Sequence, residues 1–322
     1  MSAVETAAAS DGPAASRAPR VRWTTKRKLL ALGAVWLAGV IGLVAAYGWH
    51  SVRNKSFEPQ NEFKLDPWVS IHLGGVDFSI NKAVMYLAIA AVLTCFTVIY
   101  IARRMQQRPN KVQTAVEVVY RLMHENITGS SMDEKMAARW FPFVGTLFLF
   151  ILFSNLIGYV PLPTNTEHEI TVFGLQIPSF SLYAATANLS IPLVLAIVVF
   201  VSYTAEGVRA KGPIGYLKGL VPAGVTGAMA GFIFVLEVLS NLMRLLSLSI
   251  RLFANILAGH LIILFMSGAL AVILGIAALG WITIPFGIVL FAFEVGLVAA
   301  LQAFIFATLT AIYLGGAVAD HH

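Results

Sequence analysis

The sequence predicts an all-α, polytopic helical membrane protein with about six transmembrane helices. Hydrophobic residues make up 58% of its 322 residues and charged residues only 12%, whereas a soluble domain carries about 25% charged residues. The apolar runs reach about 20 residues, enough to cross a bilayer as a helix, while strands of a membrane barrel alternate over about 10 residues. The basic residues stand mostly at the ends of these runs, so the net charge of +6 indicates membrane topology rather than nucleic-acid binding.

The N-terminal part of the chain carries two features ahead of the main domain. Residues 1–28 combine an Ala-, Ser- and Pro-rich stretch with a basic cluster, which predicts a disordered basic tail. Residues 29–47 form an apolar run that is either an extra transmembrane segment or a signal-like segment. A long stretch precedes this run and no A-x-A site follows it, which favours an uncleaved membrane anchor.

Further apolar runs and one amphipathic segment follow. In residues 110–127 the apolar side chains recur at helical spacing, which predicts an amphipathic helix at the membrane interface. Together with residues 29–47, the apolar runs make about six spans. They cover approximately Ala83–Ile101, Phe141–Val160, Tyr183–Tyr203, Gly227–Leu270 and Ala271–Gly316.

Charges in the loops predict the orientation of these spans. Basic residues follow the second run at Arg103 and Arg104, and the fourth run at Arg209 and Lys211. Such ends face the cytoplasm. The loop around His168 contains no Lys or Arg and is expected outside. Six spans then place both the N- and the C-terminus in the cytoplasm if the first segment is uncleaved.

The two C-terminal blocks are unusually long. A helix of about 40 residues measures roughly 60 Å, twice the roughly 30 Å hydrocarbon thickness of a bilayer. The block at 227–270 either breaks into two spans or forms one strongly tilted helix, and the absence of proline favours the tilted helix. We therefore expect a long tilted C-terminal helical hairpin that turns near residues 267–280. A tilted pair presents its flank to another membrane component, which predicts a partner surface.

Polar residues in the fifth run lie on one face of the predicted helix. At about 100° per residue, five of them fall within an arc of about 80°. His260 lies about 180° from Arg251 on the same helix. On the returning block, Glu294 and Gln302 are eight residues apart, which is roughly 80° around a helix. The members of the stripe are Glu237, Asn241, Arg244, Arg251 and Asn255.

Arg251 is the residue that most needs a function. A charge at bilayer depth costs about 2.5 kcal/mol or more, and an arginine cannot release its proton in a protein. The predicted orientation places Glu237 toward the cytoplasm and Arg251 with Gln302 near the middle. His260 and Glu294 then lie at similar depth toward the outside. A fixed cation between two titratable clusters blocks direct proton leakage while each cluster exchanges protons with one side. The alternative is that these groups only pair with one another and hold helices together.

No catalytic or cofactor signature occurs in the sequence. A P-loop, a G-x-G-x-x-G that opens a helix, an H-E-x-x-H motif and a serine nucleophile elbow are all absent. Cys95 is the only cysteine, which excludes a disulfide framework and a thiolate metal site. We therefore expect no cofactor, no metal ion and no catalytic site of its own in this chain.

Three sequence motifs together point to one family. SLSIRLFANILAGH covers Ser247–His260, LQAFIFATLTAIYL covers Leu301–Leu314, and FLFILFSNLIGYVP covers Phe148–Pro161. This combination resembles subunit a of the F-type ATP synthase membrane sector (Fo). The resemblance extends over residues 65–318, so the tail and the segment at 29–47 are additions to the family's pattern.

The resemblance implies a proton-channel stator subunit in a bacterial plasma membrane. In this family, two offset half-channels and a barrier arginine couple proton flow to rotation of a ring of c subunits, and other chains make ATP. The implied partners are the ring of c subunits, b-type peripheral stalk subunits, the rest of the F-type ATP synthase and the lipid bilayer. By motif matching, Arg251 is the barrier charge, and Gln302 and Asn255 accompany it. The resemblance makes His260 and Glu294 the external relay pair, with Asn155 and Asn188 helping to line the external path. It assigns Glu237 and Asn241 to the cytoplasmic path.

One departure from the family's pattern concerns Glu294. It lies eight residues before Gln302, whereas the family pattern has seven. A regular helix would therefore turn Glu294 about 100° away from the expected direction. A local bulge in the helix would restore its direction.

An independent ion channel or secondary transporter is the alternative function. Transporters commonly contain internal repeats with broken helices, and no repeat relates the two halves of this sequence. The polar residues instead concentrate in the last two blocks. A purely structural membrane scaffold would not need Arg251.

Overall fold

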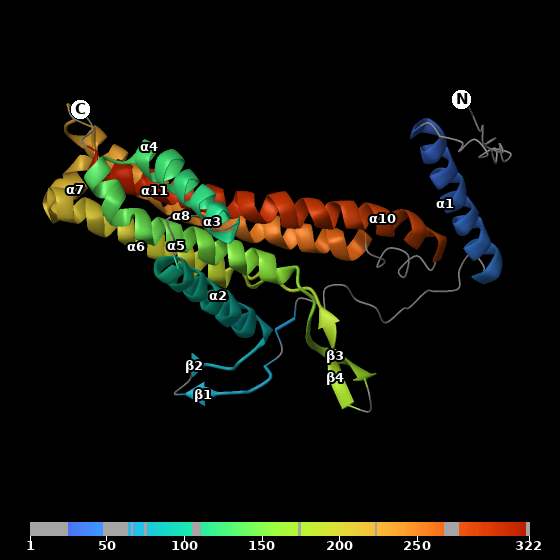
Figure 1. The fold of residues 1–322 in the computed structure, drawn as a ribbon. Coiled ribbons are helices and arrows are strands. Elements are labelled where there is room, and N and C mark those ends of the chain that lie inside the picture. The colour runs from blue at the N-terminus through green and yellow to red at the C-terminus, as the bar shows by residue number, and fades with distance from the viewer. Residues whose placement is uncertain are drawn as a thin grey trace, which may run out of the picture.

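Helices make up most of the chain in the computed structural model (Figure 1). The structure describes residues 25–47, 64–65, 67–73, 76–104, 111–172, 175–222, 224–266 and 277–319. The α-helices are α1 (Thr25–Tyr47), α2 (Lys82–Arg104), α3 (Lys111–Arg121), α4 (Gly129–Ser131), α5 (Glu134–Gly158), α6 (Ser190–Lys211), α7 (Pro213–Gly219), α8 (Ala228–Leu264), α10 (Ala277–Phe293) and α11 (Ala299–Val318). Two π-helical segments (Leu122–Thr128 and Glu294–Val298), a 3₁₀ turn (Ala185–Ala187) and the strands β1 (His72–Leu73), β2 (Val76–Asp77), β3 (Leu162–Val172) and β4 (Leu175–Ser181) complete the described elements.

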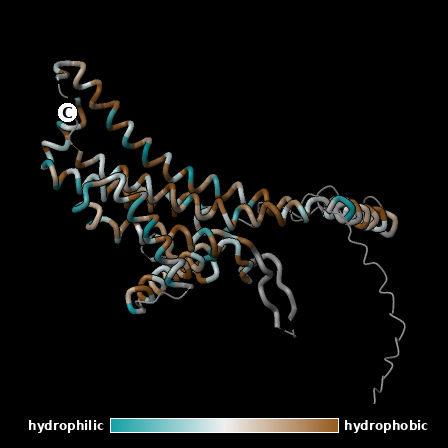
Figure 2. The backbone as a smooth tube through the Cα atoms, turned by 45° about the horizontal axis from the view of Figure 1, so that its top comes forward, coloured by the Kyte–Doolittle hydropathy of each residue, from teal (hydrophilic) through white to brown (hydrophobic). Residues whose placement is uncertain are grey.

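Five of the described helices are long and apolar enough to cross a membrane, and apolar residues dominate the long helices in Figure 2. The run at 29–47 is also helical, within α1, and its passage through the membrane stays a prediction. Residues 25–28, expected to end a disordered tail, already belong to α1, because Lys and Arg are good helix formers. Residues 1–24 of that tail lie outside the described residues. The five spans are Lys82–Arg103, Glu134–Gly158, Ser190–Lys211, Ala228–Leu264 and Leu279–Val318.

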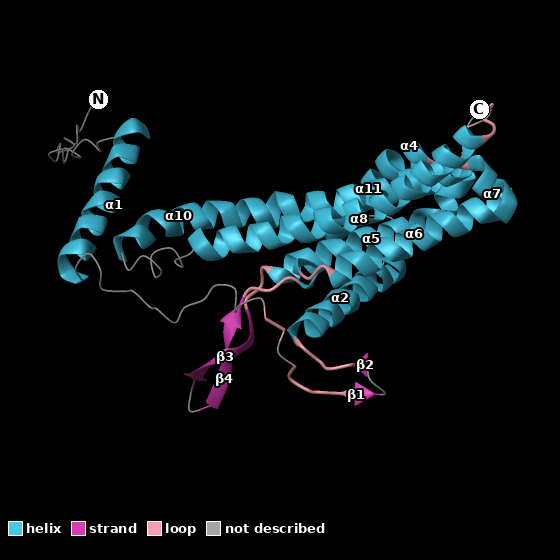
Figure 3. Cartoon of the chain, turned by 180° about the vertical axis from the view of Figure 1, so that it is seen from behind, coloured by secondary structure: helices cyan, strands magenta, loops and turns pink. Residues whose placement is uncertain are grey.

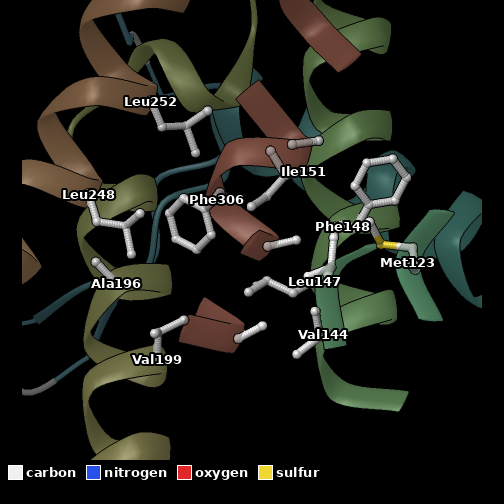
Figure 4. Close-up of a cluster of buried hydrophobic side chains, with 14 of the residues drawn as sticks. Met123, Val144, Leu147, Phe148, Ile151, Ala196, Val199, Leu248, Leu252 and Phe306 are labelled. Carbon is white, nitrogen blue, oxygen red and sulfur yellow. The ribbon is translucent and has the colours of Figure 1, made fainter. Parts of the chain in front are cut away.

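Helix α11 occupies the centre of the membrane bundle. It packs against α5 and α6, and α6 packs against α8. Every fourth residue along one side of α11 is a fully buried alanine, and such small residues let neighbouring helices approach closely. Larger side chains from α5, α6 and α8 fill the space around Phe306 (Figure 4). The alanines are Ala299, Ala303, Ala307 and Ala311.

Helix α2 packs on α5, and so does the π-helical segment Leu122–Thr128 that continues α3. Tyr86 of α2 is buried in this contact. The amphipathic helix predicted at 110–127 is confirmed from Lys111 onward as α3 and the π-helical segment that continues it. Its Met123 and Ile127 are buried while Tyr120 is exposed, as an amphipathic pattern requires. Its position at the membrane interface stays a prediction.

Helix α8 is one unbroken helix of 37 residues, so the long block does not divide into two spans. The run from α10 to α11 lies alongside it in the opposite direction (Figures 1 and 3). The predicted long helical hairpin is therefore confirmed. Of residues 267–280, where its turn is expected, 277–280 already belong to α10, and 267–276 lie outside the described residues. At one end of the hairpin α1 packs against α10, where Trp36 Nε1 donates a hydrogen bond to Trp281 O at 2.8 Å.

Two antiparallel β-hairpins depart from the all-α prediction. Strand β3 pairs with β4, with Ile170 opposite Ile177, and β1 pairs with β2, with His72 opposite Asp77. Both hairpins lie in connections between helices, on the same side of the molecule in Figure 3. The β-branched run Ile-Thr-Val at 170–172 favours strand pairing, but apolar runs of span length do not reveal strands that lie in loops. The prediction holds for the membrane bundle and misses the strands of the loops.

The end of the bundle away from these hairpins gathers several helix ends. Arg139 Nη1 on α5 lies 3.0 Å from Glu206 Oε1 on α6. Lys211 Nζ at the end of α6 donates a hydrogen bond to Ala319 O, just after α11, at 2.6 Å. The C-terminal ends of α6 and α11 therefore meet at this basic end, which the loop charges predict to be cytoplasmic.

Candidate functional site

Arg251 lies on the exposed face of α8. Its Nη2 atom lies 3.5 Å from Ser247 Oγ, and among the described residues no carboxylate oxygen lies within ion-pair distance of its guanidinium. Asn255, one turn further along the helix, is also exposed. The exposed surface around them is apolar and includes Ile250 and Ile262. The middle of the predicted polar stripe therefore faces outward from the described part of the bundle.

The part of the stripe toward the start of α8 forms a compact group, which we call the N-terminal cluster. Arg244 Nη2 lies 3.6 Å from Glu237 Oε1, and Arg244 Nη1 donates a hydrogen bond to Asn241 Oδ1 at 3.4 Å. The hydroxyl of Tyr203 on α6 also donates to Asn241 Oδ1, at 3.4 Å. The Arg244 guanidinium lies 5.8 Å from the ring centre of Tyr313 on α11. The structure thus joins Glu237 and Asn241, as expected, and surrounds them with three residues from α6, α8 and α11.

This N-terminal cluster lines an open cavity of about 660 Å³. Residues of α6, α7, α8 and α11 form its walls, among them Lys211, Tyr216 and Ile312. A water molecule takes up roughly 30 Å³ of liquid, so the cavity has room for many waters. The side chain of Glu237 is 35% exposed and is therefore reachable by water from the basic end of the bundle.

A second group, which we call the C-terminal cluster, lies toward the other end of α8. It joins His260 on α8, Glu294 at the start of the π-helical segment and Tyr159 directly after α5. The Tyr159 hydroxyl donates a hydrogen bond to Glu294 Oε2 at 3.2 Å. The rings of Tyr159 and His260 stack with their centres 4.6 Å apart. His260 and Glu294 thus lie at similar depth, as predicted, and Tyr159 contacts both of them.

The imidazole of His260 is enclosed by hydrogen-bond acceptors. Its Nδ1 lies 3.0 Å from Ile256 O, and its Nε2 lies 3.2 Å from Gly158 O. A neutral imidazole carries one N–H and donates to one of these carbonyls, whereas an imidazolium donates to both. The site therefore presents a hydrogen-bond acceptor to each of the two protons that the ring can carry.

Gly259 makes the close approach of Glu294 to α8 possible. A Cβ atom on Gly259 would lie 2.6 Å from Glu294 Cδ and 2.8 Å from Glu294 Oε1. Non-bonded carbon atoms are normally about 3.5 Å apart or more. Only a glycine therefore leaves space for the carboxylate beside this turn of α8, and His260 is the next residue in the same turn.

The π-helical segment Glu294–Val298 accounts for the unusual spacing to Gln302. The Ala299 N–H bonds to Glu294 O, five residues back, as in a π-helical turn. Such a turn accommodates one extra residue, so Glu294 and Gln302 relate as residues seven apart in a regular helix. Their directions then differ by about 20° instead of about 80°. The bulge that would restore the direction of Glu294 is present.

The two asparagines predicted for the external path have different surroundings. Asn155 on α5 is fully buried, accepts a hydrogen bond from Thr186 Oγ1 at 2.8 Å and donates one to Ala299 O at 3.3 Å. Asn188 is partly exposed, and its Oδ1 accepts a hydrogen bond from the Ser190 N–H at the start of α6, at 3.0 Å. Asn155 therefore links three helical elements, while Asn188 stabilises the beginning of one helix.

The structure does not bring Gln302 into contact with Arg251. Gln302 is 4% exposed within the bundle, whereas the Arg251 side chain faces outward, and no hydrogen bond joins them in the described part of the chain. Gln302 does lie on the buried side of α11, in line with Glu294 across the π-helical segment.

Tyr159, Tyr203 and Tyr313 are the site residues that sequence reasoning missed. Tyr159 stands inside the motif at Phe148–Pro161, but no spacing within its own helix singles it out. Its hydrogen bond to Glu294 spans 135 positions of the chain. Only a contact between distant elements could have identified it.

Both clusters are built from side chains that can bind or orient protons. They contain carboxylates, an imidazole, phenols and a fixed guanidinium, which are groups that gain, lose or orient protons. Within the described ranges no three His, Cys, Asp or Glu side chains come together as metal ligands.

Comparison with known proteins agrees with the bundle and its motifs. The family described as ATP synthase A chain matches residues 84–315. The chain is 36% identical to ATP synthase subunit a of Rubrobacter xylanophilus over 258 residues, which covers 79% of this chain and 90% of that protein. It is 33% identical over 268 residues to ATP synthase subunit a of Pelagibacter ubique, with 82% of this chain and 98% of that protein covered. The chain therefore belongs to the ATP synthase subunit a family, whose members are multi-pass membrane subunits of the F-type ATP synthase.

Proposed function

We propose that this chain conducts protons through two separate paths and that Arg251 is the barrier between them. One path enters through the cavity at the basic end and reaches Glu237 and Asn241. The other path enters from the opposite end and reaches His260 and Glu294. A ring of c subunits on the exposed face of α8 carries protons between the two paths, and its rotation drives ATP synthesis elsewhere in the complex.

The setting of Arg251 is the observation that carries this proposal. Its charge is permanent, it lies on an exposed face of a long apolar helix, and the described residues provide no carboxylate to pair with it. A charge in this setting is costly and is retained where it serves a function. A carboxylate on a facing membrane subunit would pair with it, and the apolar exposed surface of α8 suits such a subunit.

The separation of the two clusters along α8 supports two offset paths. Glu237 precedes Arg251 by 14 residues and His260 follows it by nine. At 1.5 Å per residue, these separations are about 21 Å and about 14 Å along the helix. Neither is within reach of a hydrogen bond, so a proton needs another carrier to pass from one cluster to the other. The barrier charge between the clusters opposes a direct water-mediated route.

Motif matching extends the proposal to the remaining residues and partners. Gln302 and Asn255 act beside Arg251, and Asn155 with Asn188 lines part of the external path. The basic end faces the cytoplasm of a bacterium, and so do both termini if the first segment is uncleaved. The b-type stalk subunits hold the chain in place while the ring turns.

Replacing Arg251 by Ala tests the barrier role. We expect the complex to assemble and proton-driven ATP synthesis in inverted membrane vesicles to disappear, because the ring carboxylate loses its partner. Assembly is measured by purification of the complex through another subunit. Arg139→Ala is the matched control, because it removes an arginine that is 45% exposed and lies in an ion pair on α5, outside both clusters.

Two results would overturn the proposal. One is ATP synthesis at the wild-type rate in the Arg251→Ala complex. The other is proton transport at turnover rates by the purified chain alone in liposomes, which would favour an independent channel or transporter.

A further inference from the structure

We infer that Tyr159 is a positioning residue of the external path: its hydroxyl holds the Glu294 carboxylate, and its ring holds the His260 imidazole. This inference rests on the proposed function, because it assigns a task at the same site. It adds to the acid and the histidine a third residue that connects them.

The ring of Tyr159 is held from two sides. One face stacks on His260, with an angle of 26° between the ring planes. Phe291 on α10 meets it at right angles, with the ring centres 5.8 Å apart. Tyr159 as a whole is 3% exposed, so its ring has little freedom to turn. The direction of its hydroxyl is therefore set by packing.

The backbone around Tyr159 is held as well. The Tyr159 N–H bonds to Leu156 O at 3.2 Å, which closes the last turn of α5. The preceding Gly158 lets the segment before α6 pack directly on this turn, since a Cβ atom there would lie 2.7 Å from Ala184 Cα. Gly158 also offers its carbonyl to His260 Nε2 at 3.2 Å. The same two residues at the end of α5 thus contact both members of the relay pair.

Glu294 needs such support from a distant element. Its side chain has three rotatable bonds, and on the α8 side it meets Gly259, which has no side chain to hold it. The Tyr159 hydroxyl is the side-chain donor that the structure shows at its carboxylate, at 3.2 Å. Without this donor, the carboxylate is free to take other rotamers in the space that Gly259 leaves.

Tyr159 acts as a donor and not as a proton carrier that ionises. It directly follows the span Glu134–Gly158, as the residue after the end of α5. Burial raises the pKa of its hydroxyl above the ordinary value, and the nearby Glu294 charge and hydrogen bond raise that pKa further. The hydroxyl therefore keeps its proton over the working pH range and donates to Glu294 throughout it.

The test compares Tyr159→Phe with Tyr86→Phe in the assembled complex. Tyr159→Phe keeps the ring that stacks on His260 and removes only the hydroxyl. Tyr86→Phe is the matched control, because Tyr86 is 1% exposed and its hydroxyl donates to a backbone oxygen, Val160 O, at 3.4 Å. Proton-driven ATP synthesis and passive proton conduction are measured in membrane vesicles. We expect a fall of about tenfold or more in Tyr159→Phe, the size that loss of a hydrogen bond to a charged acceptor predicts.

A spectroscopic readout separates positioning from a general structural role. The carboxyl band of Glu294 is assigned in infrared difference spectra by its loss in Glu294→Gln. We expect this band to move in Tyr159→Phe and to stay unchanged in Tyr86→Phe. If Tyr159→Phe fails to assemble, Glu294→Asp breaks the same hydrogen bond from the other side and should lower proton conduction similarly.

Each outcome decides a different claim. If Glu294→Gln conducts protons at the wild-type rate, the proposed external path is wrong. If Glu294→Gln stops conduction while Tyr159→Phe conducts like Tyr86→Phe with an unmoved band, only the role of Tyr159 is wrong.

Discussion

Replacing Gly259 by Ala should disable the external path without harming the fold. The added Cβ atom would lie 2.6 Å from Glu294 Cδ and 2.8 Å from Glu294 Oε1. Ordinary contact needs about 3.5 Å or more, so the carboxylate must retreat by about 1 Å. The retreat lengthens its 3.2 Å hydrogen bond to Tyr159 beyond useful range.

The size of the effect follows from this displacement. The clashing atoms are the flexible end of a side chain, so the backbone need not move and the complex should assemble normally. Alanine is also favoured over glycine inside a helix by about 1 kcal/mol, which opposes any loss of stability. A misplacement of about 1 Å at a reacting group can cost about a hundredfold in rate. We therefore expect proton conduction and ATP synthesis to fall by about one to two orders of magnitude.

The assay for Gly259→Ala is proton-driven ATP synthesis in inverted vesicles, with the amount of assembled complex measured in the same membranes. Gly231→Ala is the matched control, because it makes the same change in the same helix, and a Cβ atom there meets nothing within 4 Å. Equal rates in the Gly259→Ala and Gly231→Ala complexes would refute the claim that proton conduction requires the Glu294 carboxylate to lie close to α8 at Gly259.

Two further predictions concern the π-helical segment and the loop before α6. Deleting Gly296 should let the segment close as a regular α-helix with Glu294 still in line with Gln302, so proton conduction in vesicles is retained. Inserting one alanine after Gly296 should instead turn Glu294 by about 100° and abolish conduction. The opposite pattern would contradict the role of the π-helical turn. Burial raises the pKa of Tyr183 to about 12, above the ordinary value of 10.0, and a hydrogen bond from Asn188 partly opposes this. The buried neutral tyrosine therefore contributes stability below pH 10 that is lost as the pH rises toward 12, and thermal unfolding in detergent should show a shallower alkaline loss in Tyr183→Phe than in the wild type.

Much of the membrane bundle could be predicted because the signals are local. Apolar runs of span length locate the main helices, and the absence of proline in 227–270 correctly favours one long α8 over two spans. The periodicity of one helix is enough to place Arg251 and His260 on opposite sides, and the structure shows the first exposed and the second buried. Strands β3 and β4 were missed because they lie in a loop, where no apolar run of span length marks an element.

Helical spacing predicts side-chain contacts only between residues that share a helix. Glu237 and Asn241 are four residues apart, so helical spacing alone brings them together. Tyr203 and Tyr313 contact this cluster from other helices, and nothing in the sequence around either tyrosine predicts the contact. The direction of Glu294 was predictable only in part. The spacing to Gln302 shows that a regular helix would misdirect its side chain, but the spacing does not show that a π-helical turn corrects this.

The sequence by itself determined the class of the protein, the presence of the main apolar helices, the charged residue at mid-helix and the order of polar groups along α8. These features depend on composition and on residues one or two turns apart, where helical geometry is known in advance. Only the tertiary structure decided that a π-helical turn restores the direction of Glu294, that Gly259 leaves room for its carboxylate, and that Tyr159 joins it to His260. These contacts bring together α5, α8 and the segment before α11, whose relative positions are set by close packing across the whole bundle and by no single segment of the chain.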